Sequence, residues 1–195
     1  MSWQQPNPAW RDVAQRPVTS RWSAGACTSV TVLLGALGLT LAAAAGFAAE
    51  PPYALLGQAA PDFALHAVAG DNVRLSEHRG EVVVLNFWSS RCTSCRTQLA
   101  ALNRSFATYR SAGLSMYAVG VDDDPVQAQD FARTARVNFA VLLDPAKAVS
   151  RRYQVDNLPM TVLIDRNGTV RYVLRDYSAA SSTLYLQQLR TLLNE

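Results

Sequence analysis

The stretch VVVLNFWSSRCTSC, residues 82–95, decides the fold of this chain because it joins a buried strand to a helix through two cysteines. Residues 82–88 are almost continuously apolar, which is typical of a strand covered on both faces. Helical periodicity begins at the cysteines, so Cys92 lies where free backbone N–H groups and the helix dipole favour a thiolate. Cys95 follows one turn later on the same face. The spacing predicts a disulfide that opens and closes, with Cys92 attacking and Cys95 resolving.

Two other interpretations of the cysteine pair compete with exchange chemistry. A zinc site needs more ligands, but the remaining cysteine is Cys27, and His66 and His78 have no ligand-like spacing. A static structural disulfide over so short a loop would constrain the unfolded chain little. We therefore expect a redox-active pair, no metal and no other cofactor.

Periodic segments around the cysteines predict alternating strands and helices. Apolar residues at 95, 99, 102, 106 and 109 mark one face of a helix over 93–110. We expect strands at 63–68, 73–75, 82–88, 114–121, 139–143, 161–165 and 169–174, and helices after Asp124, at 147–153 and at 182–193. This order predicts an α/β fold in which helices flank a mixed central sheet. The cysteines would then lie at the carboxyl end of a parallel strand, where reactive groups gather in such sheets.

The amino-terminal part of the chain has a different composition. Residues 1–26 are polar and aperiodic and predict a flexible tail, whereas residues 27–49 carry no charge and are long enough to cross a bilayer. Three arginines precede the apolar run and Glu50 follows it, so residues 50–195 are expected to leave the cytoplasm. Two alternatives stay open for residues 27–49: a retained transmembrane anchor, or a signal segment that is cleaved.

Export determines where the domain at residues 50–195 would act. A retained anchor predicts a single-pass protein of the cell inner membrane, with this domain in the periplasm or extracytoplasmic space. Cleavage predicts a soluble periplasmic protein. Disulfides persist in either place. Residues 50–195 carry 15 Lys or Arg and 14 Asp or Glu without a basic stripe, so nucleic acid is not an expected partner.

Four motifs in residues 55–193 resemble those of the thioredoxin-like superfamily. They are APDF at 60–63, LSEHRG at 75–80, NFW at 86–88 before the CxxC motif, and LPMTVLID at 158–165. Within the superfamily, the chain resembles the membrane-tethered or periplasmic thiol–disulfide oxidoreductases of the TlpA, ResA and cytochrome c maturation types. The resemblance implies a thioredoxin-like fold, a cis peptide bond at Pro159, and a Leu158 backbone that pairs with an extended substrate segment.

Several residues near the cysteines are expected to support them, and some depart from the family pattern. Asn86 stands where thioredoxin itself has a buried acid, so it can orient a neighbour by hydrogen bonding but cannot act as a general base. Trp88 is a second supporting residue. Arg91 replaces the Trp that usually precedes the first cysteine, and it either stabilises the Cys92 thiolate or points to solvent.

Three further departures follow in the next helix turns. Ser94 replaces the common proline between the cysteines, and Gln98 and Ala100 stand where relatives often carry Glu and Pro. Losing the Glu removes a candidate proton relay. These changes leave exchange chemistry available and bear on its rate, its potential and the choice of partner.

The resemblance leads to a specific functional hypothesis. We expect an exported, membrane-anchored thiol–disulfide oxidoreductase that reduces protein disulfides and is itself reduced by a transmembrane electron donor. Apocytochrome c is one client that the resemblance suggests, which would place the protein in cytochrome c biogenesis. If the segment is retained, we expect the chain to contact the membrane through residues 27–49.

Three alternative functions stay open. A peroxiredoxin-like peroxidase would have Thr and Pro where this chain has Ser89 and Leu85. A copper-handling factor of the Sco kind would need CxxxC spacing and a later histidine, and none follows His78. A redox-inactive thioredoxin-fold binding or assembly factor is the third alternative.

Overall fold

The computed structural model describes residues 53–195. The predictions of a tail at 1–26 and of an anchor or signal segment at 27–49 lie outside the described residues. Across residues 53–195, the structure contains no helix with the length and apolar character needed to span a bilayer.

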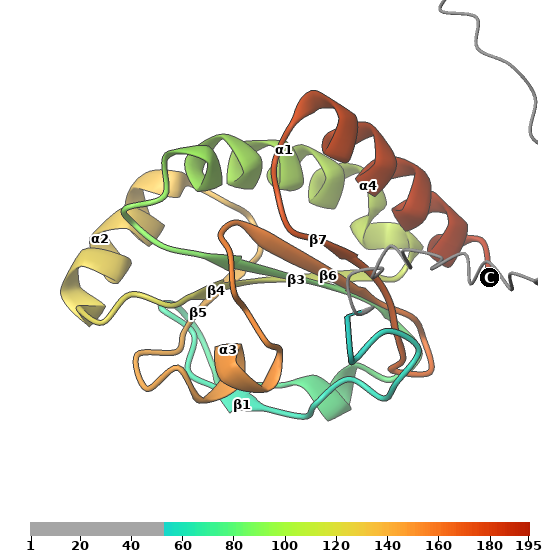
Figure 1. Ribbon diagram of the computed structural model, residues 1–195, viewed down its shortest axis with the longest axis horizontal. Helices are drawn as coiled ribbons and strands as arrows, with labels where there is room; N and C mark the ends of the chain where they lie inside the picture. Colours follow the sequence, from blue (N-terminus) through green and yellow to red (C-terminus); the bar gives the residue numbers. More distant parts are fainter. Residues whose placement is uncertain (1–52) are drawn as a thin grey trace, which may run out of the picture. The chain divides into compact units, whose positions relative to one another are not determined.

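A five-stranded mixed sheet forms the centre of the domain (Figure 1). Its strands lie in the order β5–β4–β3–β6–β7, with bounds Ala140–Leu143, Leu114–Gly120, Val82–Trp88, Met160–Ile164 and Val170–Leu174. Strands β3, β4 and β5 run parallel, whereas β6 is antiparallel to both β3 and β7. A separate two-stranded sheet pairs β1 (Ala64–Leu65) with β2 (Val73–Arg74). The thioredoxin-like mixed sheet is therefore confirmed.

Helices and the small sheet cover the two faces of the central sheet (Figure 1). One face is covered by α1 (Thr93–Tyr109), α2 (Pro125–Ala135) and α4 (Ala179–Leu193). The other face carries α3 (Ala148–Arg152) and the β1–β2 sheet. Short 3₁₀ turns lie at Leu75–His78 and Arg110–Ala112. All seven residues of β3 are buried, because its side chains alternate between the two layers.

Local capping explains where the helices begin. Asp124 accepts hydrogen bonds from the backbone N–H groups of Val126 and Gln127, as expected for the cap of α2. Helix α4 begins at Ala179, earlier than the predicted start at 182, because Ser178 and Ser181 form a capping box. The predicted strand at 63–68 was too long, since only two residues of it form regular ladder pairs.

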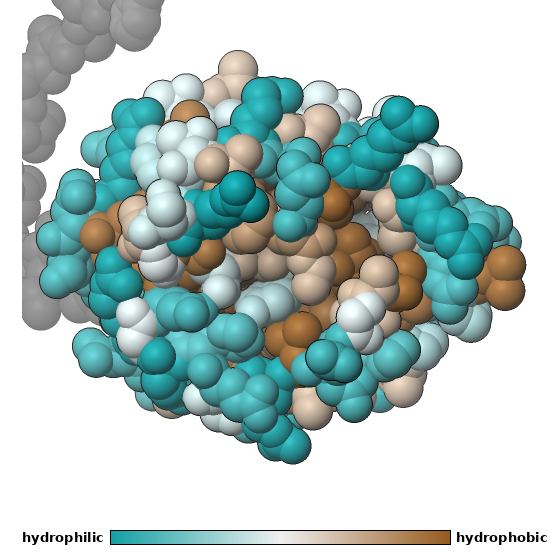
Figure 2. All heavy atoms as spheres, turned by 180° about the vertical axis from the view of Figure 1, so that it is seen from behind, coloured by the Kyte–Doolittle hydropathy of each residue, from teal (hydrophilic) through white to brown (hydrophobic). Residues whose placement is uncertain are grey.

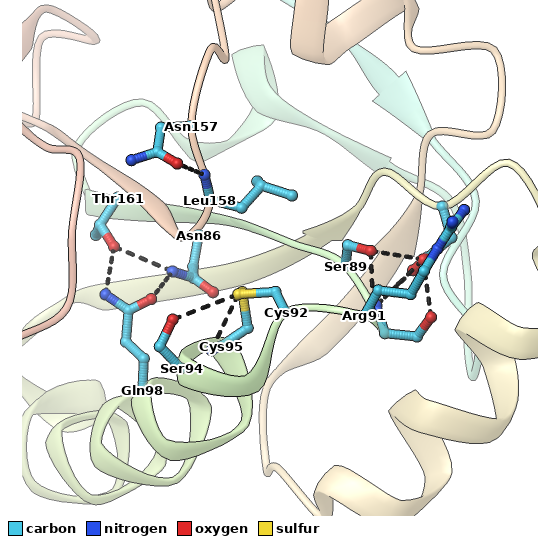
Figure 3. Close-up of a disulfide and its surroundings, with 12 residues drawn as sticks. Asn86, Ser89, Arg91, Cys92, Ser94, Cys95, Gln98, Asn157, Leu158 and Thr161 are labelled. Atoms are coloured by element: carbon cyan, nitrogen blue, oxygen red, sulfur yellow. Dashed lines mark hydrogen bonds between the residues drawn. A yellow bond between two sulfur atoms is a disulfide. The ribbon is translucent and has the colours of Figure 1, made fainter.

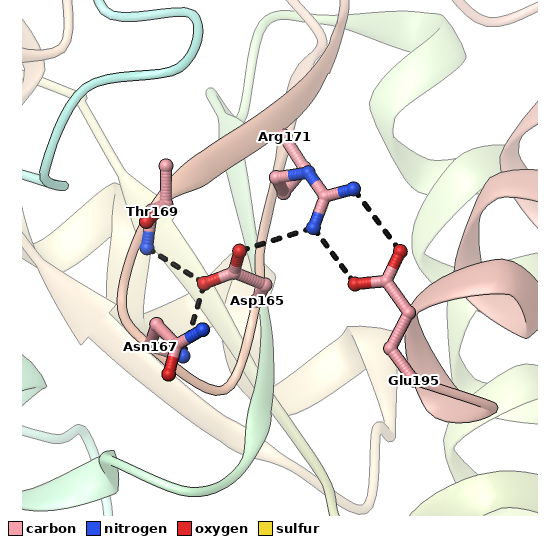
Figure 4. A network of polar contacts seen from close by, with 5 residues as sticks. All are labelled: Asp165, Asn167, Thr169, Arg171 and Glu195. Atoms are coloured by element: carbon pink, nitrogen blue, oxygen red, sulfur yellow. Dashed lines mark hydrogen bonds and ion pairs between the residues drawn. The ribbon is translucent and has the colours of Figure 1, made fainter.

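The turn between β6 and β7 is fixed to the end of α4 by a polar network (Figure 4). Asp165 accepts hydrogen bonds from the backbone N–H groups of Asn167 and Thr169. Arg171 donates to Asp165 at 3.1 Å and to both carboxylate oxygens of Glu195 at 2.7 and 3.0 Å. The hydrogen bonds that Arg171 donates to Glu195, and to a smaller extent to Asp165, raise the pKa of Arg171. Strand β6 is thereby held at the end opposite Pro159.

One face of the domain has hydrophobic atoms at its centre and hydrophilic residues around them. On the face opposite to that of Figure 1, hydrophobic atoms gather toward the middle and hydrophilic residues surround them (Figure 2). Large exposed hydrophobic side chains in the described part are Leu56, Val126 and Leu184, which come from three different segments. The remaining large hydrophobic side chains therefore lie mostly in the two layers against the sheet.

Candidate active site

The two cysteines are joined at the point where β3 gives way to α1 (Figure 3). Cys92 is the N-cap residue of α1, and its Cα lies 5.3 Å from that of Cys95. The Cys92 sulfur accepts a hydrogen bond from the Cys95 backbone N–H at 3.2 Å and lies 3.5 Å from the Ser94 hydroxyl. Cys92 is partly exposed, whereas Cys95 is 0% exposed. A large partner therefore reaches Cys92 first.

A network of hydrogen bonds holds the loop that precedes Cys92. Asp122 follows β4 and is 6% exposed, and its carboxylate accepts hydrogen bonds from the hydroxyls of Ser89 and Ser90 at 2.7 and 2.9 Å. It also accepts the backbone N–H of Ser90 at 2.9 Å. The Ser89 hydroxyl in turn accepts the backbone N–H of Arg91 at 3.3 Å. The ends of two neighbouring parallel strands are therefore joined by one buried carboxylate.

A cluster of uncharged polar side chains lies beneath the first turns of α1 (Figure 3). The Asn86 amide nitrogen donates to the Gln98 side-chain oxygen at 2.6 Å and to the Thr161 hydroxyl at 3.0 Å. The Gln98 amide nitrogen also donates to the Thr161 hydroxyl, at 3.1 Å. All three residues are buried. We call Asn86, Gln98 and Thr161 the amide cluster, and none of its three side chains is ionisable.

The loop before β6 brings a second backbone segment to the cysteines. The Leu158–Pro159 bond is cis, as the resemblance implied. Leu158 and Cys92 pack against the same core cluster, and Figure 3 shows Leu158 on the loop beside the cysteines. The Leu158 backbone N–H donates to the Asn157 side-chain oxygen at 2.9 Å. A substrate segment that uses this N–H must therefore displace the Asn157 side chain.

The remaining supporting residues lie on different sides of the site. Trp88 is fully buried, and its ring stacks on that of Phe131 with centroids 4.7 Å apart. Arg91 is exposed and its side chain extends away from the sulfurs (Figure 3). The pKa of Asp123 is lowered mainly by its hydrogen bond and ion pair with Lys147, and Arg91 makes a smaller contribution. The structure therefore places Arg91 on the solvent side of the loop.

Sequence reasoning did not identify three residues of this site. Asp122 contacts the loop before Cys92, Asn157 contacts the Leu158 backbone, and Thr161 is a member of the amide cluster. A signal for Asp122 was present, because it directly follows the predicted strand at 114–121, and reactive groups gather at the carboxyl ends of strands in α/β sheets. Thr161 lies in a predicted strand, but its neighbour across the sheet was not predicted.

Residues 56–173 match the sequence profile of the AhpC/TSA family. The chain is 34% identical to the thiol-disulfide oxidoreductase ResA of Geobacillus kaustophilus over 73% of this chain and 81% of the relative. It is also 34% identical to ResA of Bacillus subtilis, over 71% of this chain and 76% of the relative.

Solved structures show the same similarity. A crystal structure from Chlorobium tepidum, named as a thiol:disulfide interchange protein DsbE, is 35% identical with a TM-score of 0.68. The match covers 71% of this chain and 97% of that one. A secreted disulfide oxidoreductase of Mycobacterium tuberculosis, 22% identical with a TM-score of 0.59, shares the fold over 67% of this chain and 96% of its own.

Proposed function

The chain belongs to the AhpC/TSA family and is a ResA-like thiol–disulfide oxidoreductase, and we propose that it reduces protein disulfides with Cys92 as nucleophile and Cys95 as resolving thiol. The observation that carries this assignment is the unequal exposure of the two sulfurs. Cys92 is accessible at the N-terminus of α1, and Cys95 is fully buried behind it. The N–H of Cys95 that reaches the Cys92 sulfur would also stabilise a thiolate there.

The proposed reaction conserves electrons and atoms. The Cys92 thiolate attacks one sulfur of the client disulfide, forms a mixed disulfide, and releases the other client sulfur as a thiolate. Cys95 then loses its proton and attacks the Cys92 sulfur, which releases the second client thiolate and closes the Cys92–Cys95 bond. Two electrons have passed to the client. A dithiol donor in the membrane restores the pair by the reverse exchange.

The cellular setting is a further part of the proposal. We propose that residues 27–49 anchor the chain in the inner membrane and that residues 50–195 act in the periplasm or extracytoplasmic space. Support comes from the uncharged run at 27–49 and the arginines before it. Apocytochrome c disulfides are the proposed clients. The Leu158 backbone, beside the cysteines, is the proposed pairing strand for an extended client segment.

A trapping experiment tests the proposed roles. Cys95→Ala in the full-length chain removes the resolving thiol, so clients should accumulate as mixed disulfides that a reductant releases. Cys92→Ala is the matched control and should trap at least tenfold less. Equal trapping by both variants, or none by Cys95→Ala, would show that Cys92 is not the attacking sulfur.

The same purified chain separates the proposed function from a peroxidase. A peroxidase consumes hydrogen peroxide in proportion to dithiol turnover, whereas the proposed enzyme consumes peptide disulfide. Measuring the rate constants for hydrogen peroxide and for the peptide disulfide with the same dithiol donor gives the ratio of the two activities. A higher rate constant for peroxide than for the peptide disulfide would overturn the proposal.

A further inference from the structure

The amide cluster contains one polar atom without a partner. Asn86 is 0% exposed, and its side-chain oxygen has no hydrogen bond while both protons of its nitrogen are used. A buried acceptor without a donor is unfavourable by about 1–3 kcal/mol. A protein donor that reached this oxygen would therefore stabilise the cluster.

The cluster itself fixes which atom of the Asn86 amide is left over. A hydroxyl has one proton and two acceptor lone pairs, so Thr161 can accept from both amide nitrogens at once. If both amides were turned over, two oxygens would face the single Thr161 proton. The arrangement with the Asn86 oxygen unpaired is thus the one that satisfies every contact within the cluster.

The unpaired oxygen points toward the cysteine pair (Figure 3). Gln98, which binds the Asn86 nitrogen, lies one helical turn after Cys95, so Asn86 is directly beneath this part of α1. In the oxidised form neither sulfur carries a proton. Reduction supplies one, because the resolving sulfur becomes an S–H group, which is a weak donor.

Solvent is kept away from this oxygen. A cavity of about 300 Å³ lies between α1 and α4, and the buried residues Gln98 and Thr161 are among those that line it. Asn86 is not among the residues that line it. Gln98 and Thr161 are therefore the members of the amide cluster that meet the cavity, and Asn86 is 0% exposed.

We propose that Asn86 is a positioning residue that accepts a hydrogen bond from the Cys95 thiol in the reduced enzyme, and that Gln98 and Thr161 hold it in that orientation. This inference rests on the thiol–disulfide exchange proposed above. When a dithiol donor is oxidised to a disulfide, two electrons and two protons pass to this chain. The S–S bond breaks, the Cys95 sulfur keeps one proton as an S–H group, and the Cys92 sulfur releases the other proton to solvent and becomes the thiolate. The Cys95 proton then faces the Asn86 oxygen.

The proposal gives a signed effect on the redox equilibrium. A bond that exists only in the dithiol form stabilises that form, so removing the acceptor favours the disulfide. A net hydrogen bond of about 0.5–1.5 kcal/mol corresponds to a change of about 2- to 12-fold in the equilibrium constant. A tenfold change makes the reduction potential about 30 mV more negative.

The test equilibrates full-length wild type and Asn86→Leu with reduced and oxidised glutathione and measures the fraction in the disulfide form. We expect Asn86→Leu to favour the disulfide by about 2- to 12-fold. Ser105→Ala is the control, because Ser105 is buried on α1 two helical turns after Gln98 and its hydroxyl donates to the Ala101 carbonyl, outside the amide cluster. Ser105→Ala should leave the redox equilibrium constant with glutathione within about twofold of the wild-type value.

The two possible failures are distinguishable. If wild type does not exchange with glutathione, the proposed function fails. If wild type exchanges and Asn86→Leu leaves the equilibrium constant unchanged or favours the dithiol, only this inference fails.

A second measurement excludes a purely structural role. Urea unfolding of both redox forms should show that Asn86→Leu destabilises the reduced form more than the oxidised form, by the same factor as the redox shift. Equal destabilisation of both forms would overturn the proposal.

A second variant is available if Asn86→Leu does not fold. Thr161→Val then serves instead, because it removes the hydroxyl that holds the Asn86 amide in its orientation. It should favour the disulfide by a smaller factor, and a shift toward the dithiol would contradict the proposal.

Discussion

The two flanks of the disulfide are stabilised in opposite ways. Before Cys92, the Asp122 carboxylate accepts hydrogen bonds from two hydroxyls and a backbone N–H group. Behind Cys95, the amide cluster holds no charge and leaves one acceptor free. A charged acceptor whose donors are all supplied fixes a loop in one conformation. A neutral cluster with a spare acceptor can respond to the sulfur that it faces.

Removing the carboxylate should produce the largest effect. Asp122→Ala leaves the Ser89 and Ser90 donors without their acceptor in a buried place, so we expect a loss of about 3 kcal/mol in the free energy of unfolding. Urea denaturation of the oxidised chain measures it. Asp122→Asn keeps one acceptor oxygen and should lose less. A loss below about 0.5 kcal/mol for Asp122→Ala would show that the charged flank does not fix the loop.

Freeing the Leu158 backbone should produce an intermediate effect. Asn157 occupies the Leu158 N–H that a client strand would use, so Asn157→Ala removes a competitor. We expect exchange with a peptide disulfide to become about 2- to 10-fold faster, which is the range for one net hydrogen bond. The rate with glutathione disulfide is the control, since it is too short to add a strand. An equal gain for both would contradict competition at the backbone.

Changing the exposed cation should produce the smallest effect. Arg91 lies on the solvent side of the loop, so Arg91→Ala should change the free energy of unfolding by less than about 0.5 kcal/mol. The alkylation rate of the Cys92 thiol should change by less than about threefold, since exposed charges are screened. A tenfold slower alkylation would place Arg91 among the groups that stabilise the thiolate.

The local features of the fold could be predicted from the sequence. Strand β3 has the predicted bounds, since six of its seven residues are apolar and four of the first five are Val or Leu, as in a strand covered on both faces. The helix after Asp124 and the helix after the cysteines could also be predicted, because the residues that signal each helix start lie within one turn of it. The predicted start of α4 at residue 182 was three residues late, because the prediction rested on the apolar periodicity and did not use Ser178 and Ser181, which cap the helix.

The polar contacts around the site could not be predicted because they join distant parts of the chain. Ser90 and Asp122 are 32 residues apart, and they meet only because β3 and β4 are neighbours. Asn86 and Thr161 are 75 residues apart and meet through the antiparallel β3–β6 register. The sequence shows that Asn86 and Gln98 cannot relay protons, but only the tertiary pairing shows that they bind each other.

Trp88 gives the domain an optical reporter of its own chemistry. It is the one tryptophan in residues 53–195, it is fully buried, and it shares a core cluster with Cys95. Disulfides quench nearby indole fluorescence, so opening the bond should brighten its emission. With Trp3, Trp10 and Trp22 replaced by phenylalanine, stopped-flow fluorimetry would follow each electron transfer without a dye or an added label.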